Sequence, residues 1–250
     1  MRTTGSTETV ENQPQDPFTT TAWTVVISAV SDSPGAKDAL EKLCQTYWYP
    51  VYSYIRHRGY GPHDAEDLTQ EFFYQVVNMK RLRSPDRTKG RFRAYLLTAV
   101  NGLLANDWHA KHAAKRGGGA VIESLDAKSA EERYASEPMG GRSPEDTFDR
   151  RWAMTVLEQV HGVLREEFRN SGRPAIFDEA GKFLLAPLEK PGSAGAAENL
   201  GMTANALAVT VHRLRHRFRN LLRKEVARTV GDPGEVDDEM KHLLALLNEV

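Results

Sequence analysis

The most informative stretch of the chain is Asp64-Ala-Glu-Asp-Leu-Thr-Gln-Glu-Phe-Phe73. Apolar residues recur in and just after it at steps of three and four positions: Ala65, Leu68, Phe72, Val76 and Met79. This spacing predicts a helix over 64–80 with a single apolar face. Asp64 could serve simply as its N-cap, where acidic groups meet the helix dipole favourably. Asp67 and Glu71 lie four residues apart, and like charges at that spacing weaken a helix. A face that keeps them is therefore a candidate surface for a basic partner.

Helical patterns continue on both sides of this stretch, and no segment offers convincing alternating strands. The patterns cover 22–30, 36–58, 91–114, 146–164, 177–184, 194–200, the residues after Thr203, and 237–247. They predict an all-α fold, with two small helical domains joined by a flexible linker and a helix-turn-helix in the second. The expected parts are a disordered N-terminus (1–20), a first helical domain (21–116), an acidic linker (117–147), a second helical domain (148–230) and an acidic helical tail (231–250).

The helix-turn-helix prediction rests on the turn at 200–203. Gly201 can adopt the left-handed conformation that ends a helix, and Thr203 can cap the next one. The following helix places Leu207, Val211, Leu214, Phe218 and Leu221 on one face. Two helices joined by a short turn that contains glycine are typical of this motif.

Charge is unevenly spread along the 250 residues, although the net charge is only -1. Two basic zones stand out, with about +5 over 198–228 and +8 over 80–116. An arginine-rich second helix suits the DNA major groove; the alternative is an ordinary solvated face. Phe92, Tyr95 and Trp108 accompany the other zone and are candidates to stack on unpaired bases, or else to lie in the core.

Enzyme and membrane signatures are weak. The chain has neither a phosphate-binding glycine loop with its lysine nor a Gly-x-Ser-x-Gly elbow. His109 with His112, and His212 with His216, have metal-ligand spacing but no further ligands in a recognisable pattern. We therefore expect no enzyme activity, no metal and no cofactor. No apolar run is long enough to span a membrane and no signal peptide is evident, so we expect a cytoplasmic protein.

Several motifs in order along the chain resemble one family. They are Tyr49-Pro-Val-Tyr-Ser-Tyr54, the acidic stretch 64–73, Gly90-Arg-Phe-Arg-Ala-Tyr-Leu-Leu97, the segment 101–112, Ala197-Glu-Asn-Leu-Gly201 and Val211-His-Arg-Leu-Arg-His-Arg-Phe-Arg219. Together they resemble bacterial RNA polymerase sigma factors of the extracytoplasmic-function (ECF) group. The resemblance implies a non-enzymatic subunit that binds core RNA polymerase, recognises and melts promoter DNA, and directs transcription initiation.

The resemblance also implies roles for individual residues. Core-polymerase binding would fall to Asp64, Asp67, Gln70 and Glu71. The -10 promoter element would be contacted by Asn101, Asn106, Trp108 and Lys111. The -35 element would be contacted by Thr203, Asn205, His212, Arg213, Arg215, His216 and Arg219. An anti-sigma or other regulatory protein is a candidate further partner, and no membrane partner is expected.

Two departures from the family pattern bear on these expectations. The second half lacks the compact Leu-Pro-x-x-x-Arg-x-x-Phe opening and has a longer segment, 168–195, in its place. The tail from Asp232 to Val250 is extra and carries about -5 with one apolar side. It is either a short packing helix or an autoinhibitory segment that masks the arginine-rich helix.

Three other readings of the sequence remain open. The main alternative is a stand-alone helix-turn-helix transcriptional regulator that binds operators as a dimer. A protein-interaction module, such as a sigma-like decoy that binds polymerase but reads no promoter, is the second. A metal enzyme that uses the histidine pairs is the third.

Overall fold

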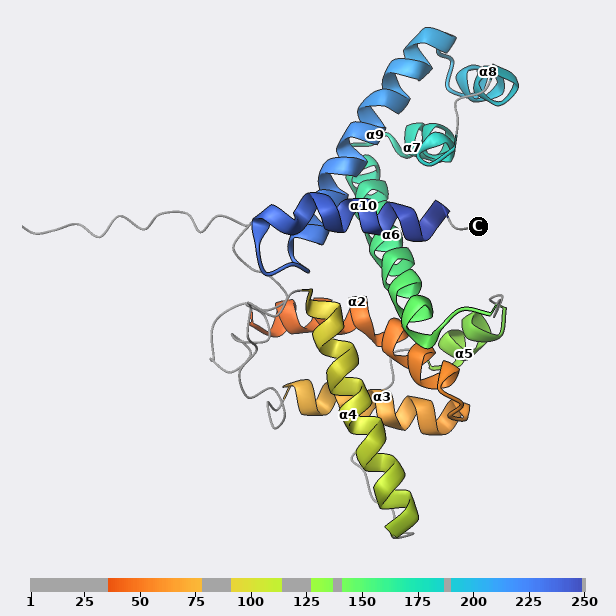
Figure 1. The fold of residues 1–250 in the computed structure, drawn as a ribbon. Helices are drawn as coiled ribbons and strands as arrows, with labels where there is room; N and C mark the ends of the chain where they lie inside the picture. The colour runs from red at the N-terminus through yellow and green to blue at the C-terminus, as the bar shows by residue number, and fades with distance from the viewer. Residues whose placement is uncertain (1–35, 78–90, 114–126, 137–140, 187–189, 249–250) are drawn as a thin grey trace, which may run out of the picture.

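Every regular element in the described part of the chain is a helix, as the hydrophobic periodicity predicts. The computed structural model describes residues 36–77, 91–113, 127–136, 141–186 and 190–248 (Figure 1). The helices are α2 (Ala36–His57), α3 (Pro62–Val77), α4 (Phe92–Ala113), α5 (Ala127–Ser136), α6 (Pro144–Asn170), α7 (Pro174–Ala180), η2 (Gly181–Phe183), α8 (Lys190–Asn199), α9 (Ala204–Ala227), η3 (Pro233–Glu235) and α10 (Val236–Asn248).

Some predictions lie outside the described residues. They are the disorder expected over 1–20, the helix expected over 22–30, and the part of the first basic zone between residues 80 and 90. Lys111 belongs to α4, but its side chain is also outside the described part.

Aromatic packing joins α2, α3 and α4 in the first half of the chain. Tyr47 of α2 meets Phe92 of α4 edge to face, with ring centroids 5.4 Å apart, and both side chains are buried. The apolar face of α3 is buried as its spacing predicts, with Ala65, Leu68 and Phe72 in the core. Because edge-to-face pairs are favourable beyond the area they bury, these rings help to fix the order in which the helices pack.

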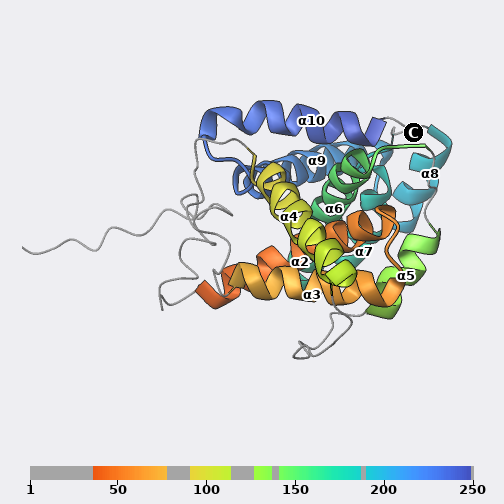
Figure 2. The same ribbon diagram turned by 60° about the horizontal axis from the view of Figure 1, so that its bottom comes forward.

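Helix α6 connects the two halves of the molecule. It begins at a regular cap: Ser143 Oγ accepts the backbone N–H of Asp146, and Pro144 occupies the first turn. Its N-terminal part packs on α2, where Phe148 meets Tyr54 at 6.2 Å, and Trp152 is fully buried. Its C-terminal part lies beside α7 and α9 (Figures 1 and 2). The buried apolar side chains of both halves form one continuous cluster, and the division into two domains stays a prediction.

The segment expected to be a flexible acidic linker contains helix α5, which packs on α2 and reaches α6. Arg56 donates two hydrogen bonds to the carboxylate of Glu131, at 2.9 and 2.8 Å, and Tyr52 Oη donates a third at 2.5 Å. Arg133 pairs with Glu158 of α6 through two further hydrogen bonds. Local composition predicts flexibility here, whereas long-range ion pairs and the buried Tyr134 hold the helix in place.

No helix in the described ranges is long and apolar enough to cross a lipid bilayer.

Candidate nucleic-acid and protein interfaces

The solvent face of α3 carries the acidic surface expected from the sequence. Asp64, Asp67 and Glu71 are exposed, while Gln70 is half-buried and donates to Glu66 at 3.2 Å. The helix begins at Pro62, so Asp64 lies in its first turn rather than at the N-cap. With the opposite face in the core, these carboxylates project from a firmly held scaffold and suit a basic partner surface.

Helix α4 distributes its candidate DNA residues between the core and solvent. Phe92 is buried and Tyr95 half-buried, whereas Trp108 is 54% exposed. Asn106 is exposed as well. Asn101 is half-buried, and its side-chain oxygen accepts a hydrogen bond of 2.8 Å from Tyr54 Oη. An aromatic ring that is half in solvent near the end of a helix is suited to stacking on an unpaired base.

The turn between α8 and α9 has the chemistry that its sequence predicts. Gly201 has a φ of 62°. The Gly201 N–H donates to Glu198 O and the Met202 N–H to Ala197 O, each at 2.9 Å, which is the double hydrogen bond of a Schellman motif. Thr203 Oγ1 then accepts the backbone N–H of Ala206 at 3.2 Å and caps α9. The turn therefore holds α8 and α9 in a defined geometry.

Helix α9 has a buried apolar face and an exposed polar face. Its buried face consists of Leu207, Val211, Leu214, Phe218, Leu222 and Val226. The exposed candidates of the predicted -35 set are Thr203, Asn205, His212, Arg213, His216 and Arg219. Together they form an exposed surface, here called the α9 face, whose cations suit a phosphate backbone or base edges.

Arg215 differs from the other candidates on α9. It is half-buried, and its Nε donates to Phe183 O at 2.9 Å while its Nη2 donates to Ala186 O at 2.7 Å. Both carbonyls belong to the chain that follows α7, 29 and 32 residues away. The guanidinium thus ties α9 to the neighbouring segment, an interaction that helical periodicity does not reveal.

The two candidate nucleic-acid surfaces lie far apart on the molecule. In Figure 1 the C-terminal end of α4 points to the bottom of the view and the N-terminal end of α9 to the top. Closer to the middle, Lys42 of α2 pairs with Glu225 of α9 at 2.8 Å, and the Phe92 N–H donates to Thr229 O at 3.1 Å. These contacts hold α2 and the beginning of α4 against the end of α9.

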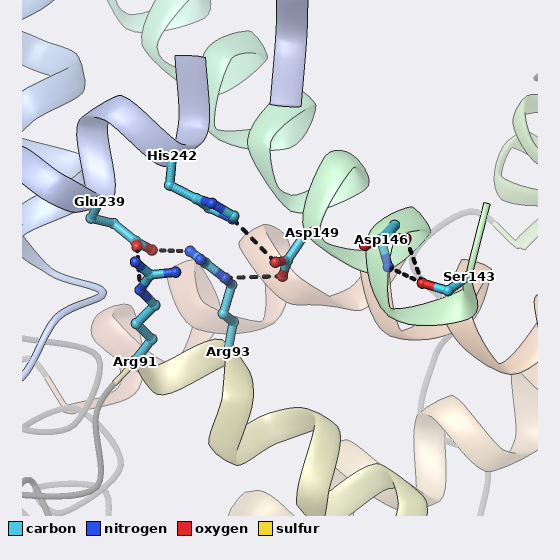
Figure 3. A network of polar contacts seen from close by, with 7 residues as sticks. All are labelled: Arg91, Arg93, Ser143, Asp146, Asp149, Glu239 and His242. Carbon is cyan, nitrogen blue, oxygen red and sulfur yellow. Dashed lines mark hydrogen bonds and ion pairs between the residues drawn. The ribbon is translucent and has the colours of Figure 1, made fainter. Parts of the chain in front are cut away.

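A group of charged residues that the sequence does not single out lies at this junction. It joins Arg91 and Arg93, at the start of α4, to Asp149 of α6 and to Glu239 and His242 of α10 (Figure 3). Arg93 and Glu239 are both buried. Burial lowers the pKa of Arg93, and Asp149 opposes that shift. No short motif links residues so distant in the chain, so only the folded structure identifies the group.

The described residues offer neither a cluster of metal ligands nor a reactive thiol. Within them, no three or more His, Cys, Asp or Glu side chains gather in a way that could hold a metal ion. Cys44 is partly buried, and burial followed by the charge of Glu41 raises its thiol pKa to about 11. The thiol is thus a poor nucleophile at neutral pH.

Comparison with known proteins finds a family similarity in the first half of the chain. Residues 43–113, which comprise most of α2 together with α3 and α4, match the family model of Sigma-70 region 2. Over 113 residues the chain is 34% identical to the ECF RNA polymerase sigma factor BldN of Streptomyces coelicolor. That alignment covers 45% of this chain and 38% of the relative's length. No solved structure matches the chain. Both similarities point the same way, because the matched family model describes a sigma-70 region and the relative is an extracytoplasmic-function sigma factor.

Proposed function

We propose that this protein is an ECF-type sigma factor, a subunit that binds core RNA polymerase and directs transcription initiation. The observation that carries the proposal is the Sigma-70 region 2 match over α2–α4, because it coincides with the acidic face of α3 and the exposed Trp108. The folded core beneath α3 supplies the rigid support that a docking surface needs.

In this proposal each charged surface has one role. Asp64, Asp67, Gln70 and Glu71 bind core polymerase. The end of α4, with Asn106, Trp108 and Lys111, captures an unstacked base of the -10 element, and Asn101 supports that helix through Tyr54. Extruding a base costs a few kcal/mol, which a stacking contact of about 1–3 kcal/mol offsets in part.

The α9 face contacts the -35 element in the same proposal. Its exposed side chains are supported by the cap at Thr203 and by the tie that Arg215 makes to the segment after α7. Arg215 therefore acts as a positioning residue, while Arg213 and Arg219 contact DNA directly. The proposal also includes regulation by an anti-sigma or other protein, whose identity is open.

Co-elution with bacterial core RNA polymerase on size exclusion tests the first role. Asp67→Arg/Glu71→Arg reverses two charges on α3 and should abolish co-elution. Glu132→Arg/Glu198→Arg makes the same change at exposed positions of α5 and α8 and should leave co-elution intact. If the parent protein fails to co-elute but binds duplex DNA tightly on its own, the protein is a stand-alone regulator instead.

A further inference from the structure

Helix α10 makes a buried ionic contact that its acidic sequence does not predict. Glu239 is 1% exposed, and its carboxylate meets both Arg91, at 2.9 Å, and Arg93. These arginines lie about 146 residues earlier in the chain, at the beginning of α4. The guanidinium of Arg93 also lies over the Trp152 ring of α6, 4.5 Å from its centroid. The guanidinium of Arg93 thus lies between Glu239 of α10 and Trp152 of α6.

Further contacts fasten α10 on either side of Glu239. Arg93 Nε also pairs with Asp149 Oδ1 at 2.9 Å, and His242 Nε2 lies 3.3 Å from the other oxygen of Asp149 (Figure 3). Toward the end of α10, Arg150 Nη1 donates to Leu246 O at 2.8 Å. A cation at this position suits the negative end of the helix dipole. The helix therefore bridges α4 and α6.

The carboxylates of α10 occupy arginines from both basic zones of the chain. Arg91 and Arg93 belong to the zone over 80–116, and Arg223, which pairs with Asp237, belongs to the zone over 198–228. The exposed cations of the α9 face, such as Arg213 and Arg219, are left uncovered. The simplest autoinhibition model expects the tail to cover the arginine-rich helix, but the exposed cations of the α9 face are not covered by it. The tail pairs instead with cations near the junction of α4 and α9.

The balance of forces allows this contact to open. Buried ion pairs contribute little net stability, because desolvation offsets their attraction. Removing one partner is nevertheless strongly destabilising, because it leaves the other charge buried without compensation. The apolar contribution of α10 comes from the buried Val236 and Leu243 and from Met240, Leu246 and Leu247, which are partly buried against the core, whereas Leu244 is 45% exposed. The aromatic pairs Tyr47–Phe92 and Tyr54–Phe148 involve no side chain of α10, so the helix can leave its site without unfolding that aromatic core.

We propose that α10 is an internal latch: Glu239 holds the start of α4, other residues of α10 hold α6 and α9, and release of the helix frees arginines and the surrounding helices for promoter DNA. The inference rests on the proposed function, because it assigns a regulatory element to arginines of the same two basic zones. In the latched state, α10 carboxylates take the place of phosphates on Arg91 and Arg223, and the two candidate DNA surfaces are held at opposite ends of the molecule.

Hydrogen–deuterium exchange on the full-length chain tests the latch itself. Glu239→Gln leaves Arg93 without its buried countercharge, so amides of α10 and of the first turns of α4 should exchange about 100-fold faster. Asp238→Asn removes the same charge from the adjacent, exposed position, where the partner Lys241 lies on the same helix. That control should change exchange less than about fivefold. Equal exchange in the two variants would overturn the latch.

The unmodified protein provides a second measurement in case Glu239→Gln perturbs the whole fold. With exchange followed at increasing denaturant, amides of α10 should open before those of α2 and α6. If α10 opens only together with α2 and α6, it is an integral part of the core and the proposal is wrong.

The affinity of the protein–core polymerase complex for promoter DNA tests whether α10 inhibits DNA binding. Glu239→Gln should bind promoter DNA about tenfold more tightly than Asp238→Asn, within the usual range of coupling between two states. The slope of log affinity against log salt should become steeper by about one to two, because each freed arginine that contacts a phosphate adds about 0.9. Fast α10 exchange with unchanged affinity and slope would refute inhibition while leaving the sigma-factor role intact. Absence of polymerase binding in every variant would refute the sigma-factor role. The hydrogen–deuterium exchange experiment would still test the latch, because it does not depend on polymerase.

Discussion

Arg215 and Arg219 lie one helical turn apart on α9, yet their substitution by alanine should affect different properties. Arg215→Ala should lower the stability of the fold, whereas Arg219→Ala should lower the affinity for promoter DNA. Arg215 is half-buried and donates to Phe183 O and Ala186 O, whereas Arg219 is exposed. Alanine is the best helix former, so neither change weakens α9 through helix propensity. Any loss of stability therefore reports the lost contacts.

The magnitude follows from the two hydrogen bonds of Arg215. A hydrogen bond to a charged group contributes about 1.5–3 kcal/mol when buried. Because Ala186 is exposed and water can replace the guanidinium there, we discount the pair to about 2 kcal/mol in total. For a chain of this length that corresponds to a fall in Tm of about 4–8 °C. Arg219→Ala should change the unfolding free energy by less than about 0.5 kcal/mol.

Thermal unfolding and promoter binding of the same two variants form the assay. Arg219→Ala should keep its Tm and lose about 1–3 kcal/mol of promoter affinity, in line with a direct DNA contact. Arg215→Lys keeps the charge but cannot span both carbonyls, so it should recover only part of the lost stability. If Arg215→Ala keeps the parent Tm and weakens promoter binding as much as Arg219→Ala does, Arg215 is a direct DNA contact and the structural role argued above is wrong.

Three further predictions concern α5, α2 and α4. The hydrogen bonds from Arg56 hold the pKa of Glu131 below its ordinary value of 4.5, so their stabilisation is present above that pH and is lost as the pH falls through the depressed pKa. In chemical denaturation Glu131→Gln should therefore be less stable than the parent at pH 7, and the difference should shrink as the pH falls below 4.5 and through the depressed pKa. A difference independent of pH would contradict the ion pair. The raised pKa of Cys44, about 11, leaves about one thiolate in a thousand at pH 8, so a disulfide reagent should react slowly until the protein unfolds. Native reactivity equal to that of a free thiol would show that the cysteine is accessible. Trp108→Ala removes a ring that is 54% exposed and should shift Tm by less than about 2 °C while impairing promoter opening, measured by permanganate reactivity of unpaired thymines. Normal opening would exclude a stacking role.

Local sequence determined most of the helices in the described residues, although α5 lies in a stretch whose composition predicts a linker. The steps of three and four from Ala65 to Val76 predict a helix over 64–80, and α3 spans 62–77. The pattern over 91–114 corresponds to α4 at 92–113, and Gly201 with Thr203 makes the turn that their residue types favour. These features depend on residues within one or two turns of each other, so the sequence alone contains the physics that forms them.

The acidic surface of α3 follows from the same local rule. Once its apolar residues are buried, the opposite side of the helix must face solvent, and Asp67 and Glu71 are found there. Trp108 is less determined by periodicity, because both burial and exposure fit its position on α4. Its 54% exposure is known only from the folded structure.

Only the tertiary structure decided which charged residues face solvent and which are paired inside. Arg215 and Arg219 are alike in sequence, but the segment after α7 reaches only Arg215. Glu131 belongs to a stretch whose composition is that of a linker, and its partners Arg56 and Tyr52 lie more than 70 residues away. Glu239 belongs to an acidic tail and is nonetheless buried against two arginines, Arg91 just before α4 and Arg93 in its first turn. The physical reason is that helix formation is governed by neighbours in the chain, whereas the pairing of a charge is governed by whichever distant segments the packed core brings beside it.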